Sequence, residues 1–120
     1  MKIAITSIGQ QLSDRHDPRF GRCDYFLIYD SEKGLQKAIR NKGQDASGGA
    51  GIAAAQQIVD EKVHVVLTGN MGPNAFNLMK EAGIKVYQCN AASCAEALEL
   101  YQNEKLTELT QPGPSHHGMN

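Results

Sequence analysis

The sequence predicts an α/β domain with a five-stranded mixed sheet and helices on both faces. Five apolar or alternating runs indicate strands, and helical patterns follow the third, fourth and fifth of them. Hairpin connections make the first three strands antiparallel neighbours, whereas helical crossovers make the last two parallel to the first. The expected strand order is therefore 3-2-1-4-5, and strand two is the only reversed member.

The first half of the chain contains the predicted hairpins. Residues 2–7 alternate and form the central strand, and residues 24–30 form the next. Residues 31–34 make a turn, in which Gly34 suits a positive φ. Residues 35–41 are polar on one face, which is typical of an edge strand. The long connection 8–22 is locally basic, and a loop of that length inside a compact domain is usually functional.

The second half alternates helices and strands. A glycine-rich turn at residues 47–51 opens a helix that extends to residue 62, and residues 63–68 form a buried strand. Pro73 starts a second helix, which Gly83 ends. Residues 84–88 form the fifth strand. Ser93 and Glu96 have the spacing of a capping box for a third helix that ends near residue 102.

Length and composition favour one cytoplasmic domain over residues 1–109 with a flexible tail over residues 110–120. The chain has 120 residues and a net charge of -1, so no overall field favours nucleic acid or an acidic membrane surface. No apolar run is long enough to span a bilayer, and the start is typical of a strand rather than a signal peptide. The odd number of cysteines argues against a disulfide framework.

The chemistry-bearing residues fall at one edge of the predicted sheet, where four strands end and strand two begins. Ligands of open α/β sheets bind in this crevice. The expected cargo is a negatively charged metal–sulfur cluster, because soft sulfur ligands, guanidinium groups and helix N-termini would meet there. The candidate binding residues are Arg19, Arg22, Gly49, Ala50, Gly51, Asn70, Met71 and Gly72, and the candidate metal ligands are Cys23, Cys89, Cys94, His116 and His117.

Several of these residues also have a purely structural explanation. Cys23 is typical of a small core residue, and Met71 would then pack under its turn. A Cys94 thiolate would be stabilised by the dipole of its helix, which makes it the more reactive candidate. His16 is expected to be an exposed loop residue. The spacing of Cys89 and Cys94 fits no structural zinc site.

Five segments in the right order, across residues 2 to about 102, resemble the dinitrogenase iron–molybdenum cofactor biosynthesis family of small NifX-like domains. The matching segments are residues 2–5, 19–29, 48–52, 65–75 and 83–87. The resemblance implies a ribonuclease-H-like fold and a non-catalytic role in binding or carrying a metal–sulfur cluster. Some members resemble the orange protein type, which holds a molybdenum–copper sulfide cluster without ordinary covalent anchoring.

One position departs from the family pattern. Nitrogenase-linked members tend to carry a histidine directly before the Phe-Gly pair, whereas this chain has Arg19. The change weakens the case for iron–molybdenum cofactor and leaves room for an anionic thiomolybdate-type cluster, with which an arginine can pair. An enzyme is not expected, because strand one has no carboxylates for metal ions. The alternative is a protein-interaction or regulatory module without metal, and the expected partner is a cofactor-assembly or ATPase-type protein.

Overall fold

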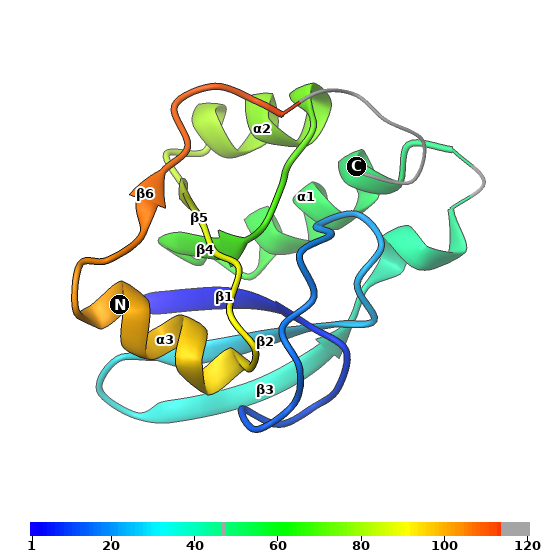
Figure 1. The fold of residues 1–120 in the computed structure, drawn as a ribbon. Coiled ribbons are helices and arrows are strands. Elements are labelled where there is room, and N and C mark those ends of the chain that lie inside the picture. Colours follow the sequence, from blue (N-terminus) through cyan, green and yellow to red (C-terminus); the bar gives the residue numbers. More distant parts are fainter. Residues whose placement is uncertain (47, 114–120) are drawn as a thin grey trace.

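The structure is a computed structural model that describes residues 1–46 and 48–113. It is an α/β domain with one six-stranded mixed sheet of order β3-β2-β1-β4-β5-β6 (Figure 1). None of the described helices combines the length and the apolar character needed to cross a membrane. The elements are β1 (Lys2–Ser7), β2 (Tyr25–Asp30), β3 (Gly34–Arg40), the 3-10 helix η1 (Lys42–Asp45), α1 (Ala50–Asp60), β4 (Val65–Thr68), α2 (Pro73–Glu81), β5 (Lys85–Gln88), α3 (Cys94–Gln102) and β6 (Thr107–Glu108).

The order of the first five strands is as predicted, and β3 lies at the edge. Strand β1 pairs antiparallel with β2 and parallel with β4, and β4 pairs parallel with β5. The expected count of five strands is wrong, because β6 pairs antiparallel with β5 and is a second reversed strand. Its two exposed residues carry no alternating pattern, so only their pairing with β5 defines them as a strand. The ribonuclease-H-like label stays a prediction.

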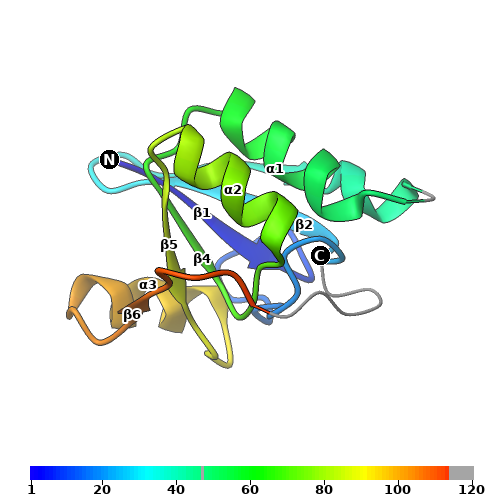
Figure 2. The ribbon, with the colours of Figure 1, turned by 90° about the horizontal axis from the view of Figure 1, so that it is seen from above.

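Helices α1 and α2 cover one face of the sheet and α3 covers the other (Figure 2). The alternation of β1 divides the core accordingly: Ala4 faces α1 and α2, whereas Ile3 and Ile5 face α3. Phe26, Val66 and Met79 belong to the first core, and Leu27, Val65 and Leu98 belong to the second. The two cores together bury the apolar side chains that stabilise the sheet.

The turn after β4 packs directly against the β1–β2 loop, which we define as residues 8–24. The backbone N–H groups of Gly69 and Asn70 both donate to the carbonyl oxygen of Pro18, each at 3.0 Å. A Cβ atom placed on Gly69 would lie 2.4 Å from the Cβ of Pro18. Glycine is therefore required here for close approach of two backbones, rather than for a positive φ.

Replacing Gly69 with alanine should destabilise the fold by about 2 kcal/mol, because the added methyl group must displace the Pro18 backbone. The matched control is Gly48→Ala, where a Cβ would meet nothing within 4 Å. Urea unfolding of the two variants measures the difference. Equal transition midpoints would contradict the close approach.

Candidate functional site

The β1–β2 loop is fixed to three neighbouring segments. Isolated β-bridges join His16 to Ser7, Arg15 to Ser93 and Arg19 to Asn70. The backbone N–H of Asp17 also donates to the carbonyl oxygen of Thr6 at 3.0 Å, and the Thr6 hydroxyl donates back to the Asp17 carbonyl oxygen. The loop is therefore held against the carboxyl ends of β1 and β4 and against the N-terminal end of α3.

Asp17 positions the Arg19 guanidinium. Its Oδ1 accepts from the Arg19 backbone N–H at 2.9 Å and from Nε at 3.1 Å, while Oδ2 accepts from Nη2 at 3.0 Å. The Asp17 side chain is 4% exposed and that of Arg19 is 52% exposed. Burial by itself raises the pKa of Asp17, but the hydrogen bonds from Arg19 outweigh it and hold the pKa below its ordinary value. The buried carboxylate thus orients a cation whose outer half faces solvent.

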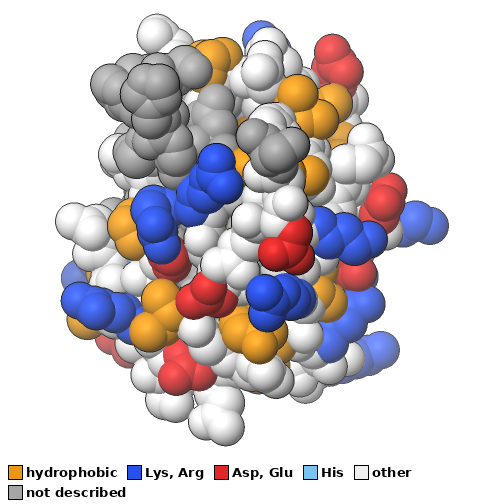
Figure 3. All heavy atoms as spheres, turned by 90° about the vertical axis from the view of Figure 1, so that its right-hand side faces the viewer, with side chains coloured by type: hydrophobic (Ala, Val, Ile, Leu, Met, Phe, Trp, Pro, Cys, Tyr) orange, Lys and Arg blue, Asp and Glu red, His pale blue; other side chains and the backbone are white. Residues whose placement is uncertain are grey.

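A hollow of about 240 Å³ lies in this loop, lined by Ile8, Arg15, His16, Asp17, Pro18 and Arg19. Arg15 and Arg19 are exposed, and Arg22 is half-buried in the same loop. Figure 3 shows lysine and arginine side chains gathered on this side of the molecule, with carboxylates between them. Although the chain is close to neutral, the hollow has two arginines at its rim.

The N-termini of α1 and α2 lie at the same end of the sheet, as Figure 2 shows. Their N-cap residues are Gly49, in the left-handed region at φ 66°, and Gly72; no side chain among residues 1–46 and 48–113 caps either helix. By contrast, Ser93 caps α3 by accepting from the Glu96 backbone N–H at 3.1 Å, as predicted. The first N–H groups of α1 and α2 therefore lack side-chain acceptors and can serve an anion.

Close packing brings the start of α1 up to the β1–β2 loop. A Cβ on Gly43, in η1, would lie 2.6 Å from the carbonyl oxygen of Ala50 and 2.8 Å from that of Gly21. Gly51 and Ala50 are buried in this contact, whereas Gly48 and Gly49 are exposed. The exposed part of the glycine-rich turn is therefore next to helix N–H donors and close to the arginine-bearing loop.

Asn70 contributes an unsatisfied donor. Its side-chain Nδ2 is buried and has no hydrogen-bond partner among residues 1–46 and 48–113. The end of the described chain lies beside it: the Gly113 N–H donates to the Met71 carbonyl oxygen at 2.8 Å, and a Cβ on Gly113 would meet the Asn70 amide. Buried amides rarely lack an acceptor, so Nδ2 is a donor that the described residues leave unsatisfied.

The three cysteines do not converge. Cys23 lies in the core under α1 and α2, whereas Cys89 and Cys94 lie in the core under α3, and each is at most 1% exposed. The pKa of all three thiols is raised, chiefly because burial disfavours the thiolate. The pKa of Cys94 is therefore raised, chiefly by burial, whereas its place at a helix N-terminus suggested a lowered pKa. The described residues contain no group of three or more His, Cys, Asp or Glu side chains that could hold a metal ion.

The remaining candidates divide between the core and the undescribed tail. Met71 is fully buried under α1 and α2, so its thioether packs in the core. His116 and His117 lie outside the described residues. The expectation that His16 is exposed is wrong: it is 4% exposed, with Nδ1 2.8 Å from the Thr6 carbonyl oxygen and Nε2 3.3 Å from that of Cys89. Backbone carbonyl oxygens of two neighbouring segments therefore lie against this ring inside the fold.

The sequence analysis missed Arg15 and Asp17 as parts of the site. The signal for Asp17 is its residue type in a loop, because an aspartate side chain often accepts from the backbone N–H two residues later in the chain. Here Asp17 accepts from the Arg19 N–H in this way. Arg15 had none beyond the basic character of the loop. Its place at the hollow depends on the bridge to Ser93, a residue 78 positions later in the chain.

Fold and site together define a small α/β domain with an anion-compatible edge. The model of the dinitrogenase iron-molybdenum cofactor family matches residues 1–104, and the chain belongs to this family. It is 35% identical over 112 residues to an uncharacterized protein of Methanocaldococcus jannaschii, covering 91% of this chain and 92% of that one.

Solved structures support the same assignment. The apo form of the orange protein from Desulfovibrio gigas is 34% identical, with a TM-score of 0.87 over 93% of this chain and 95% of that one. The NMR structure of a Thermotoga protein of the DUF35 family is also 34% identical, with a TM-score of 0.82 over 96% and 98% of the two chains. The similarity therefore spans most of the fold.

Replacing Asp17 with asparagine should lower the free energy of unfolding by about 2 kcal/mol at neutral pH, because Arg19 loses a charged acceptor. The folded-state pKa of Asp17 is depressed, so its contribution is complete above the unfolded-state pKa and is lost as pH falls through the folded-state pKa. Urea unfolding across the acidic range measures this, with the exposed Asp45→Asn as control. An undiminished difference at the acidic end would contradict a charge-based role.

Proposed function

We propose that this protein is a non-catalytic carrier that holds an anionic metal–sulfur cluster as cargo at the sheet edge formed by the β1–β2 loop and the N-termini of α1 and α2. The family, and the likeness to the orange protein and the NifX-like domains, support a role related to such clusters. The cargo is held by charge and by hydrogen bonds, without protein thiolates.

The observation that carries this proposal is the separation of the cations from the sulfur. Arg15 and Arg19 are exposed at one hollow, while Cys23 and the Cys89–Cys94 pair are buried in different cores. A thiolate ligand would have to leave the core and ionise against a raised pKa. A cluster whose own sulfides complete its metal coordination needs only countercharge and N–H donors from the protein.

The donor set favours a molybdenum–copper sulfide over an iron–molybdenum cluster. Arg19 stands where nitrogenase-linked members tend to have histidine, and a guanidinium pairs with sulfide anions rather than binding a metal. The backbone N–H groups of residues 49–51, 71 and 72, the Asn70 side-chain amide and Arg22 complete the proposed cradle; the Asn70 backbone N–H is already taken by the Pro18 carbonyl oxygen. His116 and His117 remain optional metal ligands, since they lie only three and four residues beyond Gly113.

The proposal includes no turnover. A nuclease on such a fold would need several carboxylates around two metal ions. The carboxylate at the hollow is Asp17, and its two oxygens already accept three hydrogen bonds from Arg19. The donors at this edge can bind and release an anion, and the carboxylate that lines the hollow in the described part of the chain is engaged by Arg19.

The second candidate is a partner-binding module, which two exposed apolar side chains favour. Ile8 lines the hollow and is 43% exposed, and Ile52 in the first turn of α1 is 46% exposed. Apolar side chains beside the proposed site suit a docking partner that delivers or accepts the cluster, such as a cofactor-assembly or ATPase-type protein.

Anaerobic reconstitution tests the carrier. The protein is incubated with tetrathiomolybdate and copper, and separately with iron and sulfide, then desalted and analysed for visible absorbance and metal per chain. A triple Cys23→Ala, Cys89→Ala and Cys94→Ala variant should retain the cluster. An Arg15→Gln and Arg19→Gln variant should lose it, with affinity lower by about tenfold or more per arginine, since each removes a charge-assisted hydrogen bond.

The matched control is Lys80→Gln with Lys85→Gln, which removes the same charge at the far ends of α2 and β5. It should load like the wild type, and circular dichroism should show that every variant is folded. Loss of the cluster in the cysteine variant alone would indicate thiolate ligation. A wild-type protein that retains no metal but co-purifies with a partner would favour the interaction module.

A further inference from the structure

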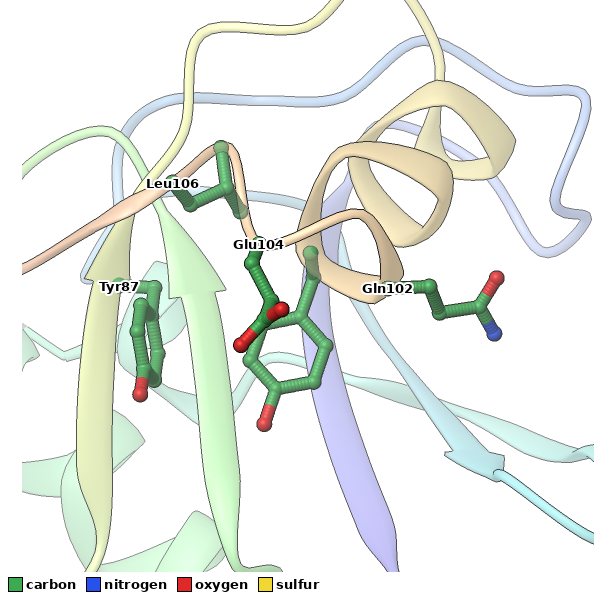
Figure 4. A pocket seen from close by; sticks show the side chains of 5 residues that line it. Tyr87, Gln102, Glu104 and Leu106 are labelled. Atoms are coloured by element: carbon green, nitrogen blue, oxygen red, sulfur yellow. The ribbon is translucent and has the colours of Figure 1, made fainter.

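A second hollow, of about 380 Å³, lies between β5 and the end of α3, where α3 and β6 meet on the side of Figure 1 away from the β1–β2 loop. It is lined by Tyr87, Tyr101, Gln102, Glu104 and Leu106 (Figure 4). We call it the tyrosine hollow. Its side chains take no part in the proposed cluster site.

The two tyrosines form a rigid aromatic wall. Their ring centroids are 5.1 Å apart with an interplanar angle of 70°, an edge-to-face arrangement. The Tyr101 hydroxyl donates to the Met1 sulfur at 3.5 Å, which fixes that ring from its outer end. An aromatic face attracts cations through its quadrupole, and an ordered pair presents such a face without further ordering.

Glu104 sits at a backbone position that favours glycine. Its φ is 57°. Two backbone hydrogen bonds close the end of α3 here: the Glu104 N–H donates to the Tyr101 carbonyl oxygen at 3.0 Å, and the Lys105 N–H donates to that of Leu100 at 2.9 Å. Most helices place glycine at this left-handed position. A glutamate is less favourable there than glycine, and it places a carboxylate at the hollow.

Glu104 lines the same hollow as the two tyrosines. In Figure 4 the Glu104 side chain points into the space beside Tyr87, whereas Gln102 points away from it. In the described part of the chain, Glu104 forms no salt bridge with a lysine or arginine. The last turn of α3 also contains no basic residue, although the negative end of the helix dipole favours a cation there.

We propose that the tyrosine hollow binds an organic cation, an alkylammonium or guanidinium group, against the two tyrosine rings and the Glu104 carboxylate. Three independent features favour positive charge at one place: the ring faces, the unpaired carboxylate and the C-terminal end of α3. The group can belong to a free small molecule or to a lysine or arginine side chain of another protein, because both present the same chemistry.

Titrations followed by backbone amide NMR test this proposal. The probes are choline and N-acetyl-arginine amide, and their uncharged counterparts are 3,3-dimethyl-1-butanol and N-acetyl-citrulline amide. Saturable shifts should appear in residues 85–88 and 99–108 with the cations only. Tighter binding of choline would indicate a free quaternary ammonium as the source, and tighter binding of the arginine amide would indicate a protein side chain.

Substitutions separate binding from stability. Glu104→Gln, which keeps the backbone position but removes the charge, should weaken binding about tenfold. Glu104→Gly should abolish binding while raising the melting temperature, because glycine relieves the left-handed strain. Lys62→Gly is the matched control: Lys62 also has φ 57° but follows α1, so it should raise the melting temperature and leave binding unchanged.

Two results with the wild-type protein would overturn the proposal. One is the absence of saturable shifts in the wild-type protein with both cations. The other is equal shifts from the cations and from their uncharged counterparts, which would show an apolar hollow without charge selectivity. Unchanged cation binding in a folded Glu104→Gln variant would show that the carboxylate takes no part in binding, which also contradicts the proposal.

Discussion

The pairing of the buried Asp17 carboxylate with Arg19 is the interaction on which the candidate site depends. Two hydrogen bonds from the guanidinium and one from the Arg19 backbone N–H reach this carboxylate, at the point where the bridge to Asn70 holds the loop. A flexible arginine would lose side-chain entropy on binding an anion, and this one has lost much of it already. The fold therefore supplies a preorganised cation at the end of β1 and β4.

The position of the sulfur atoms decides what kind of binding this edge permits. All three cysteines follow or begin elements at this edge, as the topology requires, but they lie in cores on opposite faces of the sheet. Burial keeps them protonated and adds packing rather than ligands. The exposed groups are arginines and helix N–H donors, so the edge favours an anion that brings its own metal coordination.

The sequence was sufficient for the strand order through β5, the edge position of β3 and the capping of α3, because periodicity and connection length determine these features. It could not reveal β6, whose two residues are defined only by their partner strand. Strand order predicts that the candidate residues share one edge of the sheet, but it does not predict which face of the sheet each side chain packs on. Cys23 and Cys94 therefore share the edge but lie in different cores. The burial of His16 depends on its contacts with Thr6 and Cys89, which are distant from it in the sequence.

The salt dependence of cluster retention tests the central claim most directly. At about 1 M salt the Debye length falls to roughly 3 Å, so an exposed ion pair is strongly screened whereas a metal–thiolate bond is not. The loaded protein is desalted in parallel at low and high potassium chloride, and metal per chain is measured. Binding by charge predicts release at high salt; equal retention in both buffers would contradict it.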